Sequence, residues 1–337
     1  MASFLEVKNI SKAFAGVQAL DDVSISIDLG EIHCLVGENG SGKSTLIKII
    51  GGVLKPDDGE IRINGKFFSP GHAIDAIRKG IQIIYQDLSI FPNLSVAENI
   101  SLNQLLEKGN KFVGKKTVLK TAEKALKEIE EELDLFAKVE NLSMSKRQIV
   151  AISRALTQNA RLIIMDEPTS AITKAEVDHL FSVIMRLKKK GIATLFVSHK
   201  LGEIFEIAES VTIIRDGEKI GDYLAGELDN SKLTFLMTGQ KIDATTYQRD
   251  REKLSNDNLL EVKNLNRKGH YRDIGFSVKR GDILGITGLI GSGRTELALS
   301  LFGLNKPDSG DIILDGHPVA IQSAYEAMRL GLGYLPE

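Results

Sequence analysis

The sequence contains a single cysteine, Cys34, and no tryptophan among its 337 residues. One thiol excludes an internal disulfide, so a reducing compartment is the simplest interpretation, and Cys34 in the apolar run IHCLV is expected to be a small buried side chain. No apolar run approaches the roughly 20 residues that a membrane helix needs. The N-terminus also lacks the basic flank and apolar run of a signal peptide. Any membrane-spanning role is therefore expected to belong to other chains.

An excess of positive charge is absent too. Lys and Arg number 43 against 45 Asp and Glu, which gives a formal net charge of −2. A protein that binds nucleic acid by neutralising phosphates is usually more basic, so nucleic acid is not expected as a partner. The 42% hydrophobic and 26% charged residues are typical of a soluble globular chain, and the length predicts two domains.

The chain repeats itself. LEVKNI recurs as LEVKNL, which relates Glu6 to Glu261 at an offset of 255 residues. GENGSGKST recurs as GLIGSGRTE and KPDDGEIRINGK as KPDSGDIILDGH, both at the offset of 251 that relates Gly37 to Gly288. A register held over so long a span indicates an internal duplication. We therefore predict one complete copy followed by a partial one.

These repeats set the domain boundaries. We predict a first domain at 1–240, a linker at 241–258 and a truncated second domain at 259–337, whose last residue falls opposite Gln86. We expect that either the expressed piece or the gene itself is shortened. The linker is part of a polar stretch that begins near Ala225, in which the run KLTFLM is apolar enough to pack.

Short β-branched runs alternate with helical patterns in the first domain: IHCLV, IQIIY, LIIMD, ATLFVS and VTIIR. This alternation predicts an α/β fold with a parallel sheet. The dipeptide Asp216-Gly217 predicts a hairpin turn. Apolar residues at helical spacing predict an amphipathic helix over 115–133. It belongs to a helical subdomain that we place at about 88–160.

The segment GENGSGKST fits the phosphate-binding pattern G-x-x-x-x-G-K-[ST] between an apolar run and a helical pattern. Its glycines allow a tight loop whose backbone N–H groups face phosphate oxygens, and the following helix adds its dipole. Lys43 is expected to reach the β- and γ-phosphates of ATP, and the Ser44 hydroxyl to bind Mg²⁺. The candidate nucleotide-binding residues of this loop are Gly37, Asn39, Gly40, Ser41, Gly42, Lys43, Ser44 and Thr45.

Two adjacent carboxylates follow the apolar run LIIM. Asp166 at a strand end is placed to hold Mg²⁺, directly or through water. Glu167 is the candidate general base that orients an attacking water. Two such acids could also belong to a solvated loop, but the phosphate loop upstream favours the metal and base roles.

In this order of motifs the chain resembles the ABC ATPase family over nearly its whole length. The resemblance implies that Phe14 stacks on adenine, that Gln86 contacts Mg²⁺ and the attacking water, and that His199 contacts the γ-phosphate. It also implies the fold: a P-loop ABC ATPase domain with a parallel sheet core, an antiparallel β subdomain and a helical subdomain. A partial second copy is expected to follow.

The signature motif of that family, which is similar to LSGGQ, is expected shortly before the carboxylate strand. This chain reads LSMSKRQ at 142–148. The residues that fit are Leu142, Ser143 and Gln148. Ser145 replaces a glycine, and Lys146 and Arg147 depart from the pattern. The resemblance implies that this motif begins a helix and offers its N-terminus, with Ser143 and Ser145, to the γ-phosphate on an opposing domain. Serine leaves the backbone less free than glycine to approach that phosphate.

The second phosphate loop, GLIGSGRTE, departs further. Arg294 stands in the lysine position, although Thr295 keeps a hydroxyl. A planar guanidinium fork does not replace a compact ammonium conservatively. No aromatic residue stands clearly in the position of Phe14, and Glu337 takes the place of the glutamine. We therefore predict a degenerate nucleotide site in the second copy.

Several short motifs narrow the resemblance. The GxxGxGRTE loop, YLPE, DEPTSAIT and LMTGQKID resemble the ATPases of bacterial ribose, xylose and galactoside importers, whose relatives also serve purine nucleosides and autoinducer-2. The resemblance implies an ATP-hydrolysing subunit, peripheral on the cytoplasmic face of the inner membrane. Its partners would be permease subunits, contacted near Gln86 to Asn99, and through them a periplasmic or lipid-anchored solute-binding protein. Two ATPase domains would pair head to tail.

Two other functions stay open. One is a truncated half-motor that binds ATP without autonomous activity, because the second copy lacks a signature. The other is a soluble ABC protein of translation or repair. The intact Glu167 favours retained hydrolysis, while the charge balance and the importer-like motifs favour transport.

Overall fold

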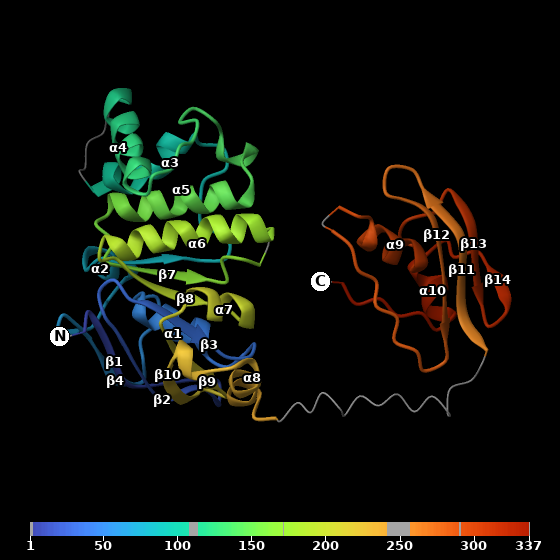
Figure 1. The fold of residues 1–337 in the computed structure, drawn as a ribbon, viewed down its shortest axis with the longest axis horizontal. Coiled ribbons are helices and arrows are strands. Elements are labelled where there is room, and N and C mark those ends of the chain that lie inside the picture. Colours follow the sequence, from blue (N-terminus) through green and yellow to red (C-terminus); the bar gives the residue numbers. More distant parts are fainter. Residues whose placement is uncertain (1–2, 108–113, 171, 241–256, 290, 337) are drawn as a thin grey trace. The chain divides into compact units, whose positions relative to one another are not determined.

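The computed structural model describes residues 3–107, 114–170, 172–240, 257–289 and 291–336. The chain divides into two compact units, Met1–Asp243 and Ala244–Glu337 (Figure 1). Most of the predicted linker and Glu337 lie outside the described residues. No helix in the described ranges is both long and apolar enough to cross a membrane.

A ten-stranded sheet forms the frame of the first unit, in the order β5-β4-β1-β2-β10-β9-β3-β8-β7-β6 (Figure 1). Its antiparallel part contains β1 (Leu5–Phe14), β2 (Val17–Ile27), β4 (Asp58–Ile63) and β5 (Lys66–Phe68). The other part contains β3 (Ile32–Val36), β6 (Ile81–Ile84), β7 (Leu162–Asp166), β8 (Ala193–Val197), β9 (Ser210–Arg215) and β10 (Glu218–Leu224). Strands β6, β7, β8, β3 and β9 pair in parallel. The predicted fold class is confirmed, as is the hairpin turn at Asp216-Gly217 between β9 and β10.

Each face of the parallel strands builds its own core, because successive side chains of a strand point to opposite faces. Cys34 and Phe196 join the core that includes α6 (Lys174–Lys189) and α7 (Leu201–Ile207). Leu35 and Leu195 join the core that includes α1 (Lys43–Ile50) and α2 (Ala73–Arg78). Cys34 is fully buried, as predicted, and burial raises the pKa of its thiol, which therefore stays protonated.

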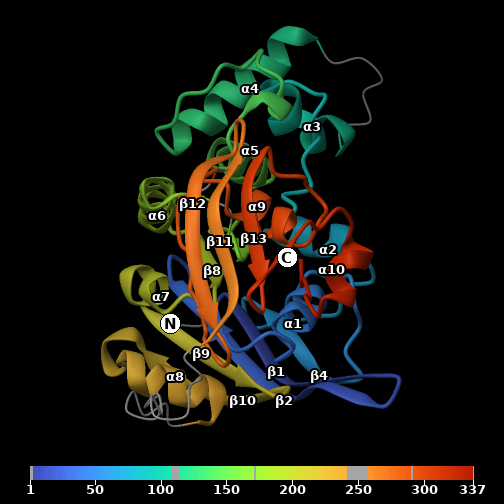
Figure 2. The same ribbon diagram turned by 90° about the vertical axis from the view of Figure 1, so that its right-hand side faces the viewer.

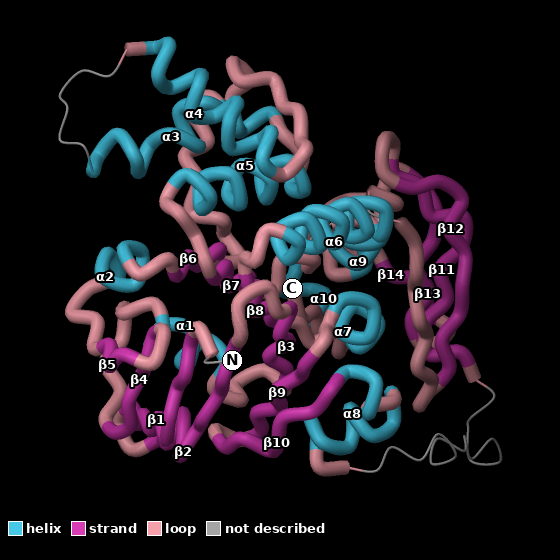
Figure 3. The backbone as a smooth tube through the Cα atoms, turned by 60° about the vertical axis from the view of Figure 1, so that its left-hand side comes forward, coloured by secondary structure: helices cyan, strands magenta, loops and turns pink. Residues whose placement is uncertain are grey.

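Three helices form a separate layer: α3 (Val96–Glu107), α4 (Lys115–Glu128) and α5 (Met144–Thr157). They pack against one another, and α5 also contacts α6 (Figure 3). The helix predicted over 115–133 is wrong at its C-terminal end, because α4 stops at Glu128. Glu130 takes a left-handed φ of 56°, and the Glu131 carboxylate accepts hydrogen bonds from Arg186 and His179 of α6. These tertiary contacts stand where the helix would have continued.

The apolar run KLTFLM forms most of α8 (Asn230–Thr238), which packs against β9. Leu233 and Met237 are buried, so the prediction that this run packs is confirmed. Asp229 caps the helix by accepting the backbone N–H of Lys232 at 2.8 Å, and Gly239 ends it in the left-handed conformation.

The second unit contains a four-stranded antiparallel sheet in the order β12-β11-β13-β14. Figure 2 shows β12, β11 and β13 of this sheet side by side. Its elements are β11 (Asn258–Arg267), β12 (Tyr271–Lys279), α9 (Arg294–Leu301), β13 (Ser309–Leu314), β14 (His317–Val319) and α10 (Ala324–Arg329). Leu260 lies opposite Val278 and Leu314. The first unit has the same pairing, in which Leu5 lies opposite Ile27 and Ile63. The strand register thus follows the two sequence offsets.

The stretch 282–289 of the second unit corresponds in sequence to β3 but forms no strand among the described residues. In the first unit β3 is buried between β8 and β9. Counterparts of those two strands are not present in the described part of the second unit. Ile283 and Leu289 are accordingly 79% and 86% exposed. A strand with this composition therefore needs its neighbours in order to form.

Candidate nucleotide site

The carboxyl ends of four neighbouring parallel strands meet at one edge of the first unit's sheet. Strand β3 leads into the phosphate loop, β8 towards His199, β7 into Asp166 and Glu167, and β6 towards Gln86. The order β3-β8-β7-β6 places these ends side by side. Ligands of such sheets bind at the carboxyl ends of the strands. Sequence motifs that are far apart along the chain are therefore brought to one edge.

The phosphate loop depends on glycine where it touches β2. Gly42 has a φ of 103°, and a Cβ there would lie 2.5 Å from the carbonyl oxygen of Ala19. No other residue fits this conformation and this approach. Helix α1 begins directly after it, at Lys43. Within the loop, Asn39, Gly40 and Ser44 are exposed, Thr45 is half-buried, and Gly37 and Ser41 are buried.

Lys43 folds back over its own loop. Its Nζ donates to the backbone oxygens of Gly37 at 2.8 Å and Glu38 at 2.7 Å, and the residue is 7% exposed. Burial lowers the pKa of Lys43, while the charges of Glu167 and Asp166 act in the opposite direction. The ammonium is thus held by its own loop, where the charges of both carboxylates still act on it. Arg294, which stands in the lysine position of the second unit, is exposed.

The two carboxylates after β7 have different environments. Burial and the charge of Glu167 raise the pKa of Asp166. Glu167 has a φ of 47°, which is unusual for a residue other than glycine and indicates local strain. Its backbone N–H donates to Val197 O at 3.0 Å, and its Oε1 lies 3.0 Å from His199 Nδ1. The structure therefore pairs the candidate base with the candidate γ-phosphate ligand.

The oxygen donors at this edge suit magnesium. The Asp166 carboxylate, the Ser44 hydroxyl and the Gln86 amide all offer hard oxygen atoms. Mg²⁺ is usually held by one or two carboxylates together with substrate phosphates. Ser44 and Gln86 are exposed and Asp166 is half-buried, so their oxygens are open to a phosphate-bound ion. The residues present therefore fit the predicted metal.

Phe14 lies at the end of β1, where β1 and β2 form a hairpin. It is 43% exposed, and the Lys12 ammonium lies 5.6 Å from its ring centroid. The corresponding hairpin of the second unit is four residues shorter, since the pair Arg267–Tyr271 matches the pair Lys12–Leu20. The shortening removes the segment that carries Phe14. This accounts for the aromatic residue that is missing from the second copy.

The segment LSMSKRQ begins α5 with Ser143 as its N-cap. Ser145 lies in the first turn of α5 and donates its hydroxyl to Glu176 Oε1 at 2.7 Å. The Ser143 and Ser145 hydroxyl oxygens are 3.0 Å apart. Because the Ser145 proton goes to the carboxylate, Ser143 must donate to Ser145. Hydrogen bonds from Thr173 and Ser145 hold the pKa of Glu176 below its usual range.

This network changes the expectation for Ser145. Its φ is not positive, so a serine fits the backbone here without strain. The difference from glycine is the added hydroxyl, which donates a hydrogen bond to Glu176 and accepts one from Ser143. A phosphate that binds at this helix end has to compete with Glu176 for these hydroxyl protons.

Gln148 and Arg147 support this region from within the chain. The Gln148 side chain is 3% exposed and donates from Nε2 to the Pro168 carbonyl, beside the candidate base. Arg147 donates to the backbone oxygens of Leu142 at 3.0 Å and Glu140 at 2.8 Å. Both side chains therefore hold loops in place rather than face an opposing domain.

Sequence reasoning missed a buried carboxylate near His199. Glu203 accepts hydrogen bonds from the hydroxyls of Thr169 and Ser198. A signal was present in the sequence LGEIFEI, where Glu203 precedes the buried Ile204 on the inner face of α7. A charged residue at a core position of a helix needs a partner, and that requirement points to a buried network.

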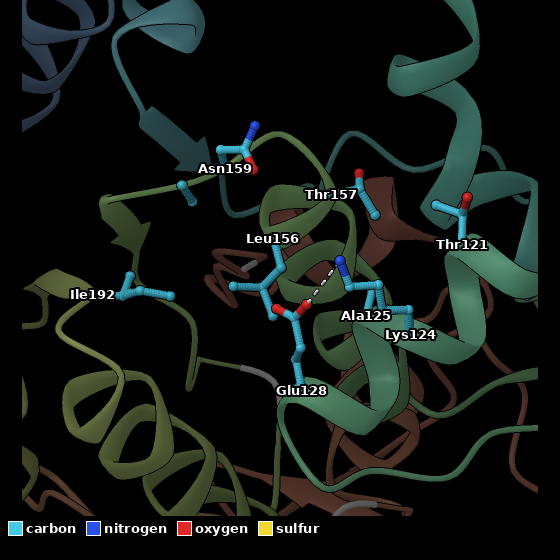
Figure 4. Close-up of a pocket in the computed structure, with 9 residues that line it drawn as sticks. Thr121, Lys124, Ala125, Glu128, Leu156, Thr157, Asn159 and Ile192 are labelled. Carbon is cyan, nitrogen blue, oxygen red and sulfur yellow. Dashed lines mark ion pairs between the residues drawn. The ribbon is translucent and has the colours of Figure 1, made fainter.

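A cavity of about 410 Å³ lies elsewhere, between α4, the end of α5 and the start of β8 (Figure 4). Lys124 and Glu128 of α4 form an ion pair at its wall, 4.0 Å apart. The cavity shares no residue with the candidate nucleotide site.

The strand order and the phosphate loop define the class: a P-loop nucleotide-binding protein. A family model described as "ABC transporter" matches residues 20–170 and 271–337. The chain therefore belongs to the ABC transporter family.

Its relatives agree with this assignment. The ribose import ATP-binding protein RbsA of Clostridium perfringens is 44% identical over 99% of this chain and 66% of its own length. Ribose import ATP-binding protein RbsA 1 of Agrobacterium fabrum is 40% identical over 99% of this chain and 65% of its own length. The chain thus spans about two thirds of the length of these relatives.

Solved structures of ATP-binding cassettes have the same fold. The ADP conformation of MJ1267, a cassette of an ABC transporter, aligns with a TM-score of 0.62 and 28% identity, covering 72% of this chain and 97% of that one. A dimeric post-hydrolysis state of the cassette MJ0796, bound to ADP and Pi, aligns with a TM-score of 0.57 and 28% identity, covering 66% of this chain and 98% of that one.

Proposed function

We propose that this chain is an ATP-binding and ATP-hydrolysing subunit that energises import of a sugar or a related small solute into a bacterium. The observation that carries the proposal is the meeting of Lys43, Asp166, Glu167 and His199 at one sheet edge. The names of the ribose import relatives support the cargo class. The first unit is the ATPase domain, and the second is a partial copy with a degenerate phosphate loop.

Nucleotide binding follows from the loop. The backbone N–H groups after β3 and the N-terminus of α1 face the phosphates. Lys43 gives up its hydrogen bond to a backbone carbonyl and donates to phosphate oxygens instead. Phe14 offers its exposed ring face to the adenine. Asp166, Ser44 and Gln86 would hold Mg²⁺, which neutralises charge on the phosphates when bound.

Hydrolysis depends on the loops after β7 and β8, which carry Glu167 and His199. Glu167 orients a water molecule for attack on the γ-phosphate and accepts its proton. His199, 3.0 Å from Glu167, directs that carboxylate and faces the γ-phosphate. Because His199 and Glu167 belong to the ends of adjacent strands, a small shift of either loop separates the base from its partner.

The resemblance to ABC ATPases implies that a complete site also needs a signature helix from an opposing domain, and the cassette MJ0796 is dimeric in its post-hydrolysis state. The second unit carries no signature among its described residues. Two first units can supply it to each other by symmetric pairing. The alternative function, an ATP-binding half-motor without autonomous turnover, is favoured by the Ser143–Ser145–Glu176 network, which occupies the signature hydroxyls.

Turnover at different protein concentrations separates these two functions. We expect the rate of phosphate release from Mg-ATP to rise faster than linearly with chain concentration, because each active site needs two molecules. A reaction without protein gives the background rate, and the Glu167→Gln variant gives the rate without the candidate base. A chain that binds ATP but releases no phosphate above that background would contradict autonomous hydrolysis and support the half-motor.

We further propose that permease subunits contact the first unit beside Gln86, at a cavity of about 250 Å³. Phe91 at its rim is 50% exposed, and the buried Gln82 amide nitrogen in its wall has no hydrogen-bond partner. Arg154 fixes the rim by donating to the backbone oxygens of Ser89 and Leu88. Apolar surface and an unpaired donor both suit a protein segment that brings a carbonyl group. A solute-binding protein would join through these permeases, at the outer face of the membrane.

Substitution of Phe91 tests this contact. Phe91→Ala is expected to weaken retention of the chain by co-expressed permease subunits in membranes by about tenfold or more, because exposed aromatic anchors dominate such interfaces. Phe67→Ala removes a similarly exposed ring, on β5, and serves as the matched control. Equal retention of both variants would place the permease contact elsewhere.

A further inference from the structure

A carboxylate outside every motif joins the loops after β7 and β8. Glu203 of α7 is 8% exposed. Its Oε2 accepts the Thr169 hydroxyl at 2.6 Å and the Ser198 hydroxyl at 2.9 Å. Thr169 lies two residues after Glu167, and Ser198 directly precedes His199. One oxygen atom therefore bridges the loop of the candidate base and the loop of the histidine that contacts it.

The bridge is closed by Lys200. Its Nζ lies 3.3 Å from Glu203 Oε1 and donates to the backbone oxygen of Thr169 at 2.8 Å. Its backbone N–H donates to Ser198 Oγ at 3.1 Å. Thr169 and Ser198 are 2% and 3% exposed, so water does not compete for these bonds. A buried carboxylate is tolerated when it is both paired and hydrogen-bonded, as this one is.

Glu167 requires an anchor of this kind. Its left-handed φ of 47° is strained, and strained residues keep their conformation only where the surrounding contacts over-determine it. The loop is fixed on one side by Gln148, which donates to the Pro168 carbonyl, and at its start by the bond from Glu167 N–H to Val197 O. Glu203 adds the attachment that links it to the histidine loop.

We propose that Glu203 is a positioning residue that holds the Glu167 loop and the His199 loop as one unit. It preserves the 3.0 Å contact between Glu167 Oε1 and His199 Nδ1 and acts through Thr169 and Ser198 without touching nucleotide. The catalytic part of this inference rests on the proposed ATPase function. A role in stability alone would lower the unfolding temperature without loosening these two loops together.

The test uses the full chain with substitutions at the bridge. Thr169→Val removes the hydroxyl at nearly constant volume, Thr169→Ser retains a hydroxyl, and Ser198→Ala removes the other arm. Glu206→Gln is the control, because Glu206 lies on the same helix and forms an exposed ion pair with Lys174 at 2.6 Å. Two readouts are compared: amide hydrogen exchange at 166–170 and 198–201, and steady-state ATP turnover.

In Thr169→Val and in Ser198→Ala we expect amide exchange to accelerate in both loops, by about tenfold. The reason is that local opening no longer has to break the bridging hydrogen bonds. We expect kcat to fall by about tenfold to about a hundredfold, with KM within about twofold, because misplacement of the base affects the chemical step. Thr169→Ser should restore both values, and Glu206→Gln should change neither.

Faster exchange in both loops, a lower kcat and rescue by Thr169→Ser together support the proposal. Acceleration confined to the substituted loop would overturn it, as would faster exchange with an unchanged kcat. If the unaltered chain shows no turnover, the proposed ATPase is contradicted, and exchange alone decides the bridge: coupled loosening of both loops supports it, and independent loosening overturns it.

Discussion

Replacement of Glu167 by glutamine is expected to lower ATP turnover by about a hundredfold or more, which is the contribution of a positioned general base. Glutamine has nearly the same size and can still hydrogen-bond to His199, so the loop geometry is kept. It cannot accept the proton of the attacking water. ATP binding should be unchanged, because the phosphate contacts come from the loop after β3.

Phosphate release and ATP binding are to be measured on the same preparation. Glu206→Gln is the matched control, since that carboxylate pairs with Lys174 away from the strand ends. If Glu167→Gln retained more than a tenth of the unaltered turnover, another group would have to act as the base, and the roles assigned to the loop after β7 would be wrong.

Replacement of Lys43 by alanine is expected to weaken ATP binding by about tenfold to about a hundredfold. Hydrogen bonds that involve charged groups contribute about 1.5–3 kcal/mol, and the Lys43 ammonium is largely shielded from water. The substitution also leaves the backbone oxygens of Gly37 and Glu38 without their donor. Binding and turnover should therefore fall together, unlike in Glu167→Gln.

Titration calorimetry with Mg-ATP measures this effect. Lys48→Ala is the control, because Lys48 is an exposed cation on the same helix, α1. Equal affinity of the Lys43→Ala variant and the unaltered chain would mean that the loop binds phosphate through its backbone alone. The same experiment on Arg294→Lys would then show whether a lysine in the second unit has any influence.

The sequence predicts the elements that have local signals. The five apolar runs that form strands, the loop before Lys43 and the turn at Asp216-Gly217 all have residue types that specify their own conformation. The end of α4 has no such signal. It is set by contacts of Glu131 with Arg186 and His179, which are distant in the sequence.

The residues of the candidate site also fall into two groups, those with a local sequence signal and those that depend on tertiary contacts. Spacing alone identifies Lys43, Asp166 and Glu167, and their roles remain predictions that the substitutions above test. The bonds of Ser145 to Glu176 and of Glu203 to Thr169 span 31 and 34 residues and depend on how helices pack against the sheet. No motif encodes such pairs, so only the structure reveals which polar residues act together.

The stretch 283–288, which lies outside any strand, affects how the chain behaves in solution. An exposed apolar segment of strand-like composition that lies outside a sheet is a template for pairing with other chains. Such aggregation would also depend on concentration, but it would be indifferent to ATP. Self-association that requires nucleotide and vanishes in Lys43→Ala thus comes from the first unit. Association that persists without nucleotide and in Lys43→Ala is expected to come from the exposed Ile283 and Leu289.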